Sequence, residues 1–234
     1  ADHWSHTRYK SWPKVAEFIK NQPPHSLFAD IGCGNGKNMR IVRECGHGGT
    51  CSDISLPLVE ICREQGFDGQ CADALVLPYR SNAFDCAVHI AVMHHFSTEE
   101  RRIEALRECM RVVKVGGRAL IYGWALEQDD DISKSRHRFE GQDVLVPWHH
   151  KLTGVKGEDW KPEKYEENKR TDVKPDHGKV NEETQAIVFE RYCHVYKQGE
   201  MEELFSHVAD AEVEEVYFDT GNWGVIAKKT SPSA

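Results

Sequence analysis

Apolar positions in the first half of the chain follow two spacings in turn. Short apolar runs, which are typical of buried strands, occupy residues 26–31, 50–52, 70–72, 84–90 and 118–124. Between them the apolar residues recur at helical spacing, which predicts helices over residues 12–21, 37–44, 56–65 and 99–113. Strands that alternate with helices predict an α/β fold, in which both faces of a parallel sheet are covered.

The pattern changes after Leu126. Residues 127–185 are polar and include a stretch rich in lysine and glutamate. A loop of such length inside a domain is usually functional or disordered, and we expect a solvated, partly disordered insertion. A helix is predicted again over residues 201–208, followed by two strands, 213–218 and 223–227, joined by a turn. This hairpin would end the sheet with an antiparallel pair.

The composition suits a soluble globular domain. The chain has 234 residues, 39% of them hydrophobic and 29% charged. Its formal net charge of −8 argues against binding nucleic acid through overall charge, although a local basic patch or a partner's surface remains open. No apolar run could span a membrane, and no basic-then-apolar signal peptide opens the chain. Scattered cysteines, which we expect to be reduced thiols, favour a cytoplasmic or nuclear protein. Because the sequence opens on Ala1 rather than methionine, we expect a trimmed chain or a fragment.

The cysteines bear on the chemistry. There are eight, scattered through predicted strands and helices, and no two form a Cys-x-x-Cys pair. Disulfide frameworks belong to short secreted chains, and zinc sites need clustered ligands. We therefore expect reduced, mostly buried thiols and no metal site.

The stretch FADIGCGNGKN, residues 28–38, places glycines directly after a predicted strand. Glycine lets the backbone turn sharply and approach a ligand, and the helix that follows offers free N–H groups. The spacing Gly32-x-Gly34-x-Gly36 is one residue shorter than a dinucleotide fingerprint, and no Walker A pattern is present. The loop therefore predicts a platform for some other small molecule.

Acidic residues end the first three predicted strands. Asp30 could pair with an ammonium, Asp53 could accept both hydroxyls of a ribose, and Asp73 could face an adenine amino group. Each alone could equally be a helix cap or a turn residue, but their occurrence at successive strand ends favours one ligand. A molecule with an ammonium, a ribose and an adenine, and without a phosphate, is S-adenosylmethionine.

The fourth predicted strand runs into VHIAVMHHF, residues 88–96. Ligands bind at the carboxyl ends of parallel strands, so this end should face the methyl group of the cofactor. The adjacent His94 and His95 cannot share a metal in the usual i, i+4 manner, and we interpret them as wall and substrate contacts. Packed, satisfied histidines are the alternative.

Basic residues gather around the predicted helix 99–113 and the strand after it: Arg101, Arg102, Arg107, Arg111, Lys114 and Arg118. Glutamates interleave with them, which is typical of a solvated, ion-paired helix face. A surface that contacts phosphates is the alternative.

Several stretches resemble the eukaryotic tRNA wobble-uridine methyltransferases, which convert 5-carboxymethyluridine in the anticodon loop to its methyl ester. The most specific are TRYKSWP at residues 7–13, VPWH at 146–149 and ERYCHVY at 190–196. The stretches ADIGCGNGK, HIAVMHHFST and GGRALIYGWALEQ are also similar. The family includes the yeast-type enzyme and the methyltransferase domain of the animal AlkB-homologue fusion.

The resemblance implies a class I (Rossmann-like) S-adenosylmethionine-dependent methyltransferase, with residues 1–234 as a single domain. The sheet would be seven-stranded and mostly parallel, with an antiparallel last hairpin and the polar insertion after strand 5. The partners implied are the tRNA anticodon loop and a small zinc-binding activator subunit in a heterodimer. The expected cofactor-binding residues are Tyr9, Trp12, Asp30, Gly32, Cys33, Gly34, Asn35, Gly36, Asp53, Ile54, Asp73, Ala74, Leu75, Ala91 and His94.

A carboxylate substrate constrains the expected catalytic residues. Its oxygen is ionised at neutral pH, so it needs no general base, but it needs cations that hold it. By resemblance, Arg8, His95, Arg191 and Tyr192 are the catalytic candidates, with surface ion pairs as the alternative for the arginines. Tyr9, Tyr192 and His194 would shape the site, and unpaired bases could stack on Trp12, Trp148 or Tyr192.

Two other functions remain open at this point. A small-molecule carboxyl- or N-methyltransferase would share the glycine loop but would not depend on tRNA. A non-catalytic methyltransferase-like subunit would bind the cofactor or a partner without turnover.

Overall fold

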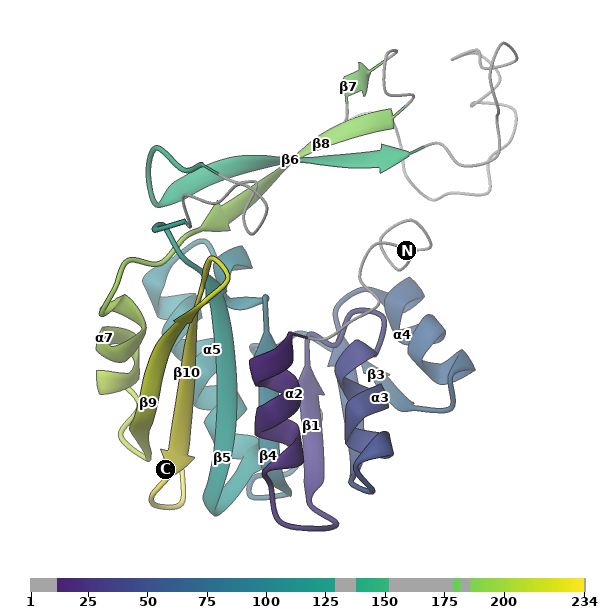
Figure 1. Ribbon diagram of the computed structural model, residues 1–234, viewed down its shortest axis with the longest axis vertical. Helices are drawn as coiled ribbons and strands as arrows, with labels where there is room; N and C mark the ends of the chain where they lie inside the picture. Colours follow the sequence, from purple (N-terminus) through teal and green to yellow (C-terminus); the bar gives the residue numbers. More distant parts are fainter. Residues whose placement is uncertain (1–11, 129–137, 152–178, 182–185, 234) are drawn as a thin grey trace.

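The computed structural model describes residues 12–128, 138–151, 179–181 and 186–233, and its main feature is a seven-stranded sheet (Figure 1). The strand order is β3-β2-β1-β4-β5-β10-β9. The strands are β1 (Leu27–Ile31), β2 (Gly48–Asp53), β3 (Asp68–Cys71), β4 (Phe84–Ile90), β5 (Val113–Trp124), β9 (Ala211–Asp219) and β10 (Asn222–Lys229). Strands β1 to β5 are parallel, and β10 is antiparallel to both β5 and β9. The predicted parallel sheet with a closing antiparallel hairpin is confirmed.

Helices cover both faces of this sheet, as the alternating pattern predicted. They are α2 (Pro13–Lys20), α3 (Lys37–Glu44), α4 (Leu56–Glu64), α5 (Glu99–Val112) and α7 (Glu200–Ser206). One core lies under α2 and α3, and a second lies under α5 and α7, on the opposite face (Figure 1). Within the described residues no helix is both long and apolar enough to span a membrane.

Helix α5 illustrates how the sequence specifies an element. Its apolar residues Ile103, Leu106 and Met110 are buried in one stripe, while its glutamates and its arginines other than Arg102 lie toward the outer face. The hydroxyl of Thr98 accepts a hydrogen bond from the backbone N–H of Arg101 and so caps the first turn. The helix thereby begins at a fixed place beside the carboxyl end of β4.

A second, three-stranded sheet differs from the prediction. Strand β6 (Asp143–Lys151) pairs antiparallel with β8 (Ala186–His194), which also pairs with β7 (Lys179–Asn181). Strand 143–151 was not predicted from the sequence, and whether the insertion over 127–185 is partly disordered stays a prediction. The polar composition around the short alternation in DVLVP concealed this strand, and its partner lies far along the chain. Whether residues 1–234 form a single domain stays a prediction.

The small sheet stands over the edge of the main sheet where the parallel strands end (Figure 1). Strand β8 contacts a short 3₁₀ helix, η1 (Met93–His95), which follows β4. Just after β8, the hydroxyl of Tyr196 donates to the carbonyl of Met93 at 2.9 Å, and the backbone N–H of Tyr196 donates to the carbonyl of Trp124 at 2.8 Å. Residues far apart in the sequence therefore meet at this edge.

Candidate functional site

A cavity of about 520 Å³ lies at the carboxyl ends of the parallel strands. Residues from the glycine loop, from β2, from η1 and from β8 line it. The predicted site residues in its lining are Gly32, Cys33, Asp53, Ile54, Asp73, Ala74, Ala91, His95 and Arg191. A second hollow of about 620 Å³, between α2 and β9, contains none of the predicted site residues.

Other predicted residues lie next to the cavity or away from it. Those that are described but are not among its lining residues are Trp12, Asp30, Gly34, Asn35, Gly36, Leu75, His94 and Tyr192. The ring of Trp12 stacks on Tyr122, with the ring centroids 5.4 Å apart. The ammonium of Lys37 lies 4.5 Å from the centroid of the same Trp12 ring. Arg8, Tyr9 and the side chain of Trp148 lie outside the described residues.

The glycine loop adopts the backbone conformation for which its sequence is suited. Gly32, Gly34 and Gly36 all have positive φ, at +74°, +56° and +75°. A Cβ atom on Gly32 would lie 2.2 Å from Cγ2 of Val92, which follows β4. The N–H groups of Gly32 and Cys33 donate to the carbonyl of Ser52 at 2.8 and 2.9 Å, which fixes the loop to β2.

Asp53 connects this loop to the end of β2. One carboxylate oxygen accepts the N–H of Gly34 at 2.9 Å, and the other accepts the N–H of Ser55 at 2.9 Å. Burial raises the pKa of Asp53 and these two N–H groups oppose the shift. A carboxylate can accept about four hydrogen bonds, so acceptor capacity remains on the side that lines the cavity.

The next strand supplies a second acid and an apolar wall. Asp73 lines the cavity, and one of its oxygens accepts the N–H of Leu75 at 3.0 Å. Ile54, whose side chain is 73% exposed, lines the cavity beside Leu58 and Ala74. Apolar surface flanked by an acid suits a planar base with an exocyclic amino group.

Asp30 lies deeper, below the cavity. It is 1% exposed, and one oxygen accepts a hydrogen bond from the side chain of Asn38 at 3.4 Å. The other oxygen has no hydrogen-bond partner among the described residues. Burial raises the pKa of Asp30 to about 7. An orphaned buried carboxylate next to a cavity fits a cationic ligand group.

The turn after β4 carries strain and aromatic rings. Ala91 has a φ of +61°, a conformation that residues with a Cβ rarely adopt, and such strain is often found at binding sites. His94 is buried and stacks on Trp124, with centroids 4.3 Å apart, while His95 is exposed and lines the cavity. The guanidinium of Arg191 lies 5.6 Å from the centroid of Trp124. Sequence reasoning missed Trp124, whose only signal was its position at the end of a predicted strand.

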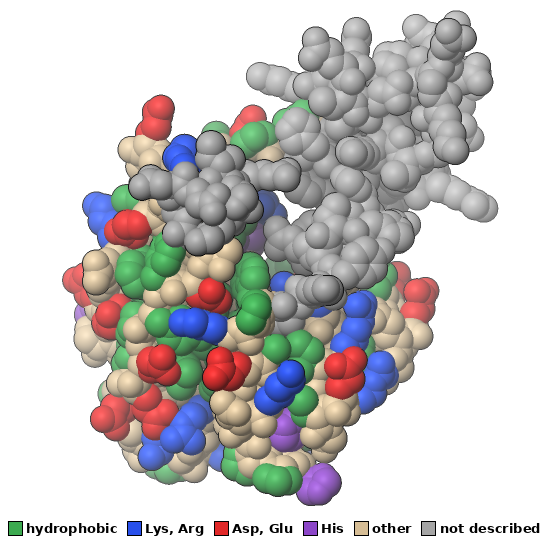
Figure 2. Space-filling view, in the orientation of Figure 1, with side chains coloured by type: hydrophobic (Ala, Val, Ile, Leu, Met, Phe, Trp, Pro, Cys, Tyr) green, Lys and Arg blue, Asp and Glu red, His purple; other side chains and the backbone are tan. Residues whose placement is uncertain are grey.

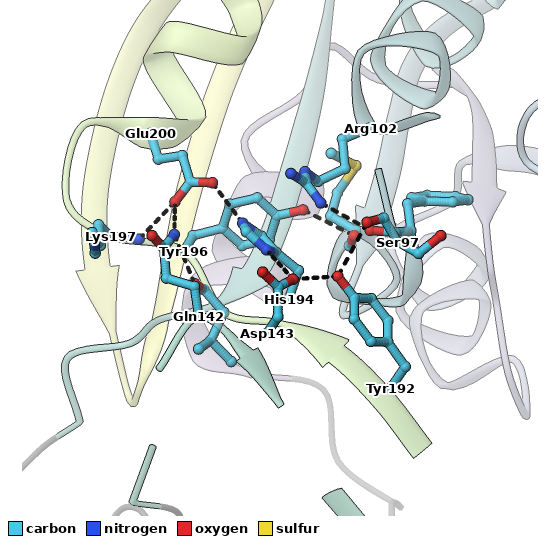
Figure 3. A network of polar contacts seen from close by, with 12 residues as sticks. Ser97, Arg102, Gln142, Asp143, Tyr192, His194, Tyr196, Lys197 and Glu200 are labelled. Atoms are coloured by element: carbon cyan, nitrogen blue, oxygen red, sulfur yellow. Dashed lines mark hydrogen bonds and ion pairs between the residues drawn. The ribbon is translucent and has the colours of Figure 1, made fainter. Parts of the chain in front are cut away.

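A polar network holds β8 in place beside this turn (Figure 3). Nδ1 of His194 contacts Asp143 at 2.9 Å, and Nε2 contacts Glu200 at 2.6 Å. The hydroxyl of Tyr192 donates to Asp143 and lies 3.2 Å from the carbonyl of Ser97. Burial lowers the pKa of His194, but the hydrogen bonds to Glu200 and Asp143 outweigh it and the pKa is raised. The two carboxylates therefore favour the protonated form of His194 relative to a histidine without partners.

Among the residues that the structure describes, two groups of side chains have potential metal-ligating atoms within 4.8 Å of one another: Cys33, Cys51 and Cys62, and His94, His95 and Cys193. The first group is a packed cluster of free thiols formed by Cys33 of the glycine loop with Cys51 and Cys62, in which Cys62 donates to the carbonyl of Gly34 at 3.3 Å. In the second, Cys193 lies 3.9 Å from Nδ1 of His95.

Comparison with solved structures defines the class of protein. The fold matches an S-adenosylmethionine-dependent methyltransferase from Clostridium acetobutylicum with a TM-score of 0.64, at 13% identity, over 98% of this chain and 95% of that one. It also matches a putative methyltransferase solved in complex with the Trm112 methyltransferase activator of Haloferax volcanii, with a TM-score of 0.58, at 14% identity, over 93% of this chain and 89% of that one. Residues 29–121 match a family profile described as a methyltransferase domain. The chain has the fold of the S-adenosylmethionine-dependent methyltransferases.

Curated relatives place it within that class. A tRNA (carboxymethyluridine(34)-5-O)-methyltransferase of Schizosaccharomyces pombe is 39% identical over 98% of this chain and 92% of its own length. The enzyme of that name, alkbh8, from Xenopus tropicalis is 38% identical over 98% of this chain, which spans 39% of that longer protein. The chain belongs to the tRNA (carboxymethyluridine(34)-5-O)-methyltransferase family.

Proposed function

We propose that this protein transfers the methyl group of S-adenosylmethionine to the carboxylate of 5-carboxymethyluridine at the wobble position of tRNA, giving the methyl ester. One observation carries the proposal: a single cavity combines acids at the strand ends with an arginine and a histidine. The acids suit a cationic nucleoside cofactor, and the arginine and histidine suit an anionic acceptor. Family membership gives the nature of the acceptor.

The residues present fit the cofactor. Asp53 would hold the ribose hydroxyls, Asp73 with Ile54 and Ala74 would hold the adenine, and the orphaned oxygen of Asp30 would face the ammonium. The backbone of the glycine loop would border the amino-acid portion. When bound, S-adenosylmethionine supplies a methyl group already activated by its sulfonium.

The chain's own contribution to the chemistry is positioning. A carboxylate is ionised at neutral pH, so no residue has to remove a proton. Arg191 would hold one carboxylate oxygen or both with its planar guanidinium, and His95 would border the reacting group. Arg8 would assist by family resemblance. Holding donor and acceptor in line inside a partly closed cavity supplies most of the rate enhancement such a reaction needs.

Aromatic side chains near the cavity would receive the RNA base. Trp124, at the end of β5, stacks on His94 and Phe139 and lies near the Arg191 guanidinium, so it would shape the wall of the base site rather than offer a free face. Trp12 packs against Tyr122, which favours a structural role for it in the described conformation. Because tRNA is the proposed substrate, we place the protein in the cytoplasm or the nucleus.

We further propose an activator subunit as partner. The net charge of −8 makes a partner that adds positive surface useful for docking tRNA. Among the described residues the edge strand β3 has one unpaired side, and Leu56 at the start of α4 and Val76 after β3, at 47% and 75% exposure, offer apolar surface for a partner. A distant structural neighbour was solved with a methyltransferase activator.

The test incubates the purified chain, with and without the activator, with tritiated cofactor and tRNA that lacks the ester. We expect tritium in the methyl ester of the wobble nucleoside after digestion, and a higher rate with the activator. Label in a small acid without tRNA would favour the small-molecule enzyme. Cofactor binding without any transfer in either mixture would favour the non-catalytic subunit.

A further inference from the structure

The basic residues around α5 are not equivalent. Most are engaged in ion pairs: Arg107 with Glu104 at 3.8 Å, Arg111 with Glu108 at 2.6 Å, Lys114 with Asp85 at 2.6 Å and Arg118 with Glu214 at 2.6 Å. Arg102 is buried and donates to the carbonyl of Phe96. The guanidinium of Arg101 makes no hydrogen bond or ion pair with any described residue, and Arg101 lines the cavity. The prediction of an ion-paired helix face therefore does not hold for Arg101.

Local helix stability does not explain this arginine. Arg101 occupies the third position of the first turn of α5, because its N–H is the one capped by Thr98. That position favours a glutamate or glutamine, which can return a hydrogen bond to the cap, and the N-terminal end of a helix disfavours a positive charge. An unpaired cation here is locally unfavourable, which is typical of residues retained for binding.

Arg191 supplies a second guanidinium to the same cavity. Its Nε is buried and has no hydrogen-bond partner among the described residues. Leaving such a donor unsatisfied costs about 1–3 kcal/mol, so an incoming acceptor would be favoured. Its guanidinium lies 5.6 Å from the ring centroid of Trp124, and Arg191 is one of the residues that line the cavity.

The two arginines are held on elements that are tied together. Tyr192, next to Arg191 on β8, reaches the carbonyl of Ser97, and Ser97 directly precedes the cap of α5 (Figure 3). Asp143 holds the same hydroxyl and is itself held by His194. This network fixes the strand that carries Arg191 relative to the helix turn that carries Arg101, so Tyr192 acts as a positioning residue.

We propose that Arg101 is a substrate-binding residue and that it forms, with Arg191, a site of two guanidinium groups for the carboxylate of the acceptor base. The inference rests on the proposed function and extends it by a residue from a different element. Two planar guanidinium groups can share the oxygens of one carboxylate and still leave a lone pair for attack on the methyl group. They would also reject an acceptor that lacks the carboxylate, because their charges would stay unpaired.

The test measures discrimination rather than activity alone. The full chain with its activator is titrated with two anticodon stem-loops, which carry either 5-carboxymethyluridine or unmodified uridine at the wobble position. The wild-type protein should bind the first more tightly. Arg101→Ala should reduce this preference by about 10-fold, the worth of a charge-assisted hydrogen bond, and Arg101→Lys should restore part of it. Arg107→Ala, on the same helix but ion-paired to Glu104, is the matched control and should leave the preference unchanged.

Each other outcome is decisive. If Arg101→Ala weakens the binding of both stem-loops equally, Arg101 binds a phosphate and the carboxylate assignment is wrong. If it changes neither affinity, Arg101 is outside the site. Failure of the wild-type protein to methylate the modified tRNA would contradict the proposed function instead, so the two failures are separable.

Discussion

Asp53 shows how one residue can connect a loop, a strand and a ligand. Its two oxygens bind N–H groups from the glycine loop and from the start of α4, and its carboxylate still borders the cavity. The sequence predicted this acid because it ends a parallel strand, and the parallel register places strand ends at one edge. The same reasoning found Asp30 and Asp73. It missed Arg101, because a cation among alternating glutamates and arginines has no distinguishing local pattern.

Asp53→Ala should weaken binding of S-adenosylmethionine about 5- to 30-fold, the equivalent of 1–2 kcal/mol, because a charge-assisted hydrogen bond to the ribose is lost. Titration calorimetry measures the effect. Asp68→Ala removes an exposed acid at the start of the neighbouring strand β3 and is the control. Equal affinity of wild type and Asp53→Ala would exclude Asp53 from the ribose site.

Asp30 predicts a pH dependence of cofactor binding. Its pKa is raised to about 7, so the carboxyl is largely neutral below that pH, and its contribution to folding stability declines as the pH rises from 3.8 through about 7. A bound ammonium favours the ionised form, so binding at pH 6 should release about one proton, and affinity should rise until the pH exceeds 7.

Calorimetry at pH 6 in two buffers with different ionisation enthalpies counts the proton. Asp30→Asn should bind without proton release at any pH. A wild-type protein that binds without releasing a proton would show that the ammonium does not face Asp30.

At the scale of elements, helices and strands with a clear local pattern were predicted correctly, whereas a strand that depends on a distant partner was not. The parallel strands and α2 to α5 follow from periodicity and turn residues within a few positions of each element. Strand β6 could not be found in this way, because it is stabilised by β8 and their pairing joins, for example, Val146 to Arg191. The same pairing brings Arg191 to the cavity, so Arg191 was predicted only through the family resemblance, whereas the acids follow from their places at the strand ends.

The glycine loop gives an element-scale prediction. Gly32 and Gly46 have nearly equal φ, +74° and +75°, but an added Cβ meets Val92 at 2.2 Å in the first case and nothing within 4 Å in the second. Gly32→Ala should therefore be destabilised by about 1–3 kcal/mol more than Gly46→Ala, the typical cost of overpacking, and should lose cofactor binding.

Denaturant titration and calorimetry of the two variants test this. Equal stability of both, with cofactor binding intact, would show that the close approach of Gly32 to Val92 does not shape the site.

At the scale of the whole molecule, a negatively charged protein presents a localised cationic site. Acidic and basic side chains are interspersed over the face of the described residues in Figure 2. Ion pairs such as Arg118 with Glu214 neutralise most of the basic groups near α5. Arg101 from α5 and Arg191 from β8 line the same cavity as the acids of β2 and of the loop after β3. Because acids and arginines line one cavity, the protein could bind a cationic methyl donor and an anionic acceptor side by side, although the chain as a whole is negatively charged.

The central claim is that acids at the ends of the parallel strands hold the nucleoside of the methyl donor. A crystal structure of the protein with S-adenosylhomocysteine at saturating concentration tests it most directly. We expect the ribose hydroxyls within hydrogen-bonding distance of Asp53, the adenine beside Asp73, and the sulfur facing His95 and Arg191. A ligand bound elsewhere, or a ribose turned away from Asp53, would contradict the account.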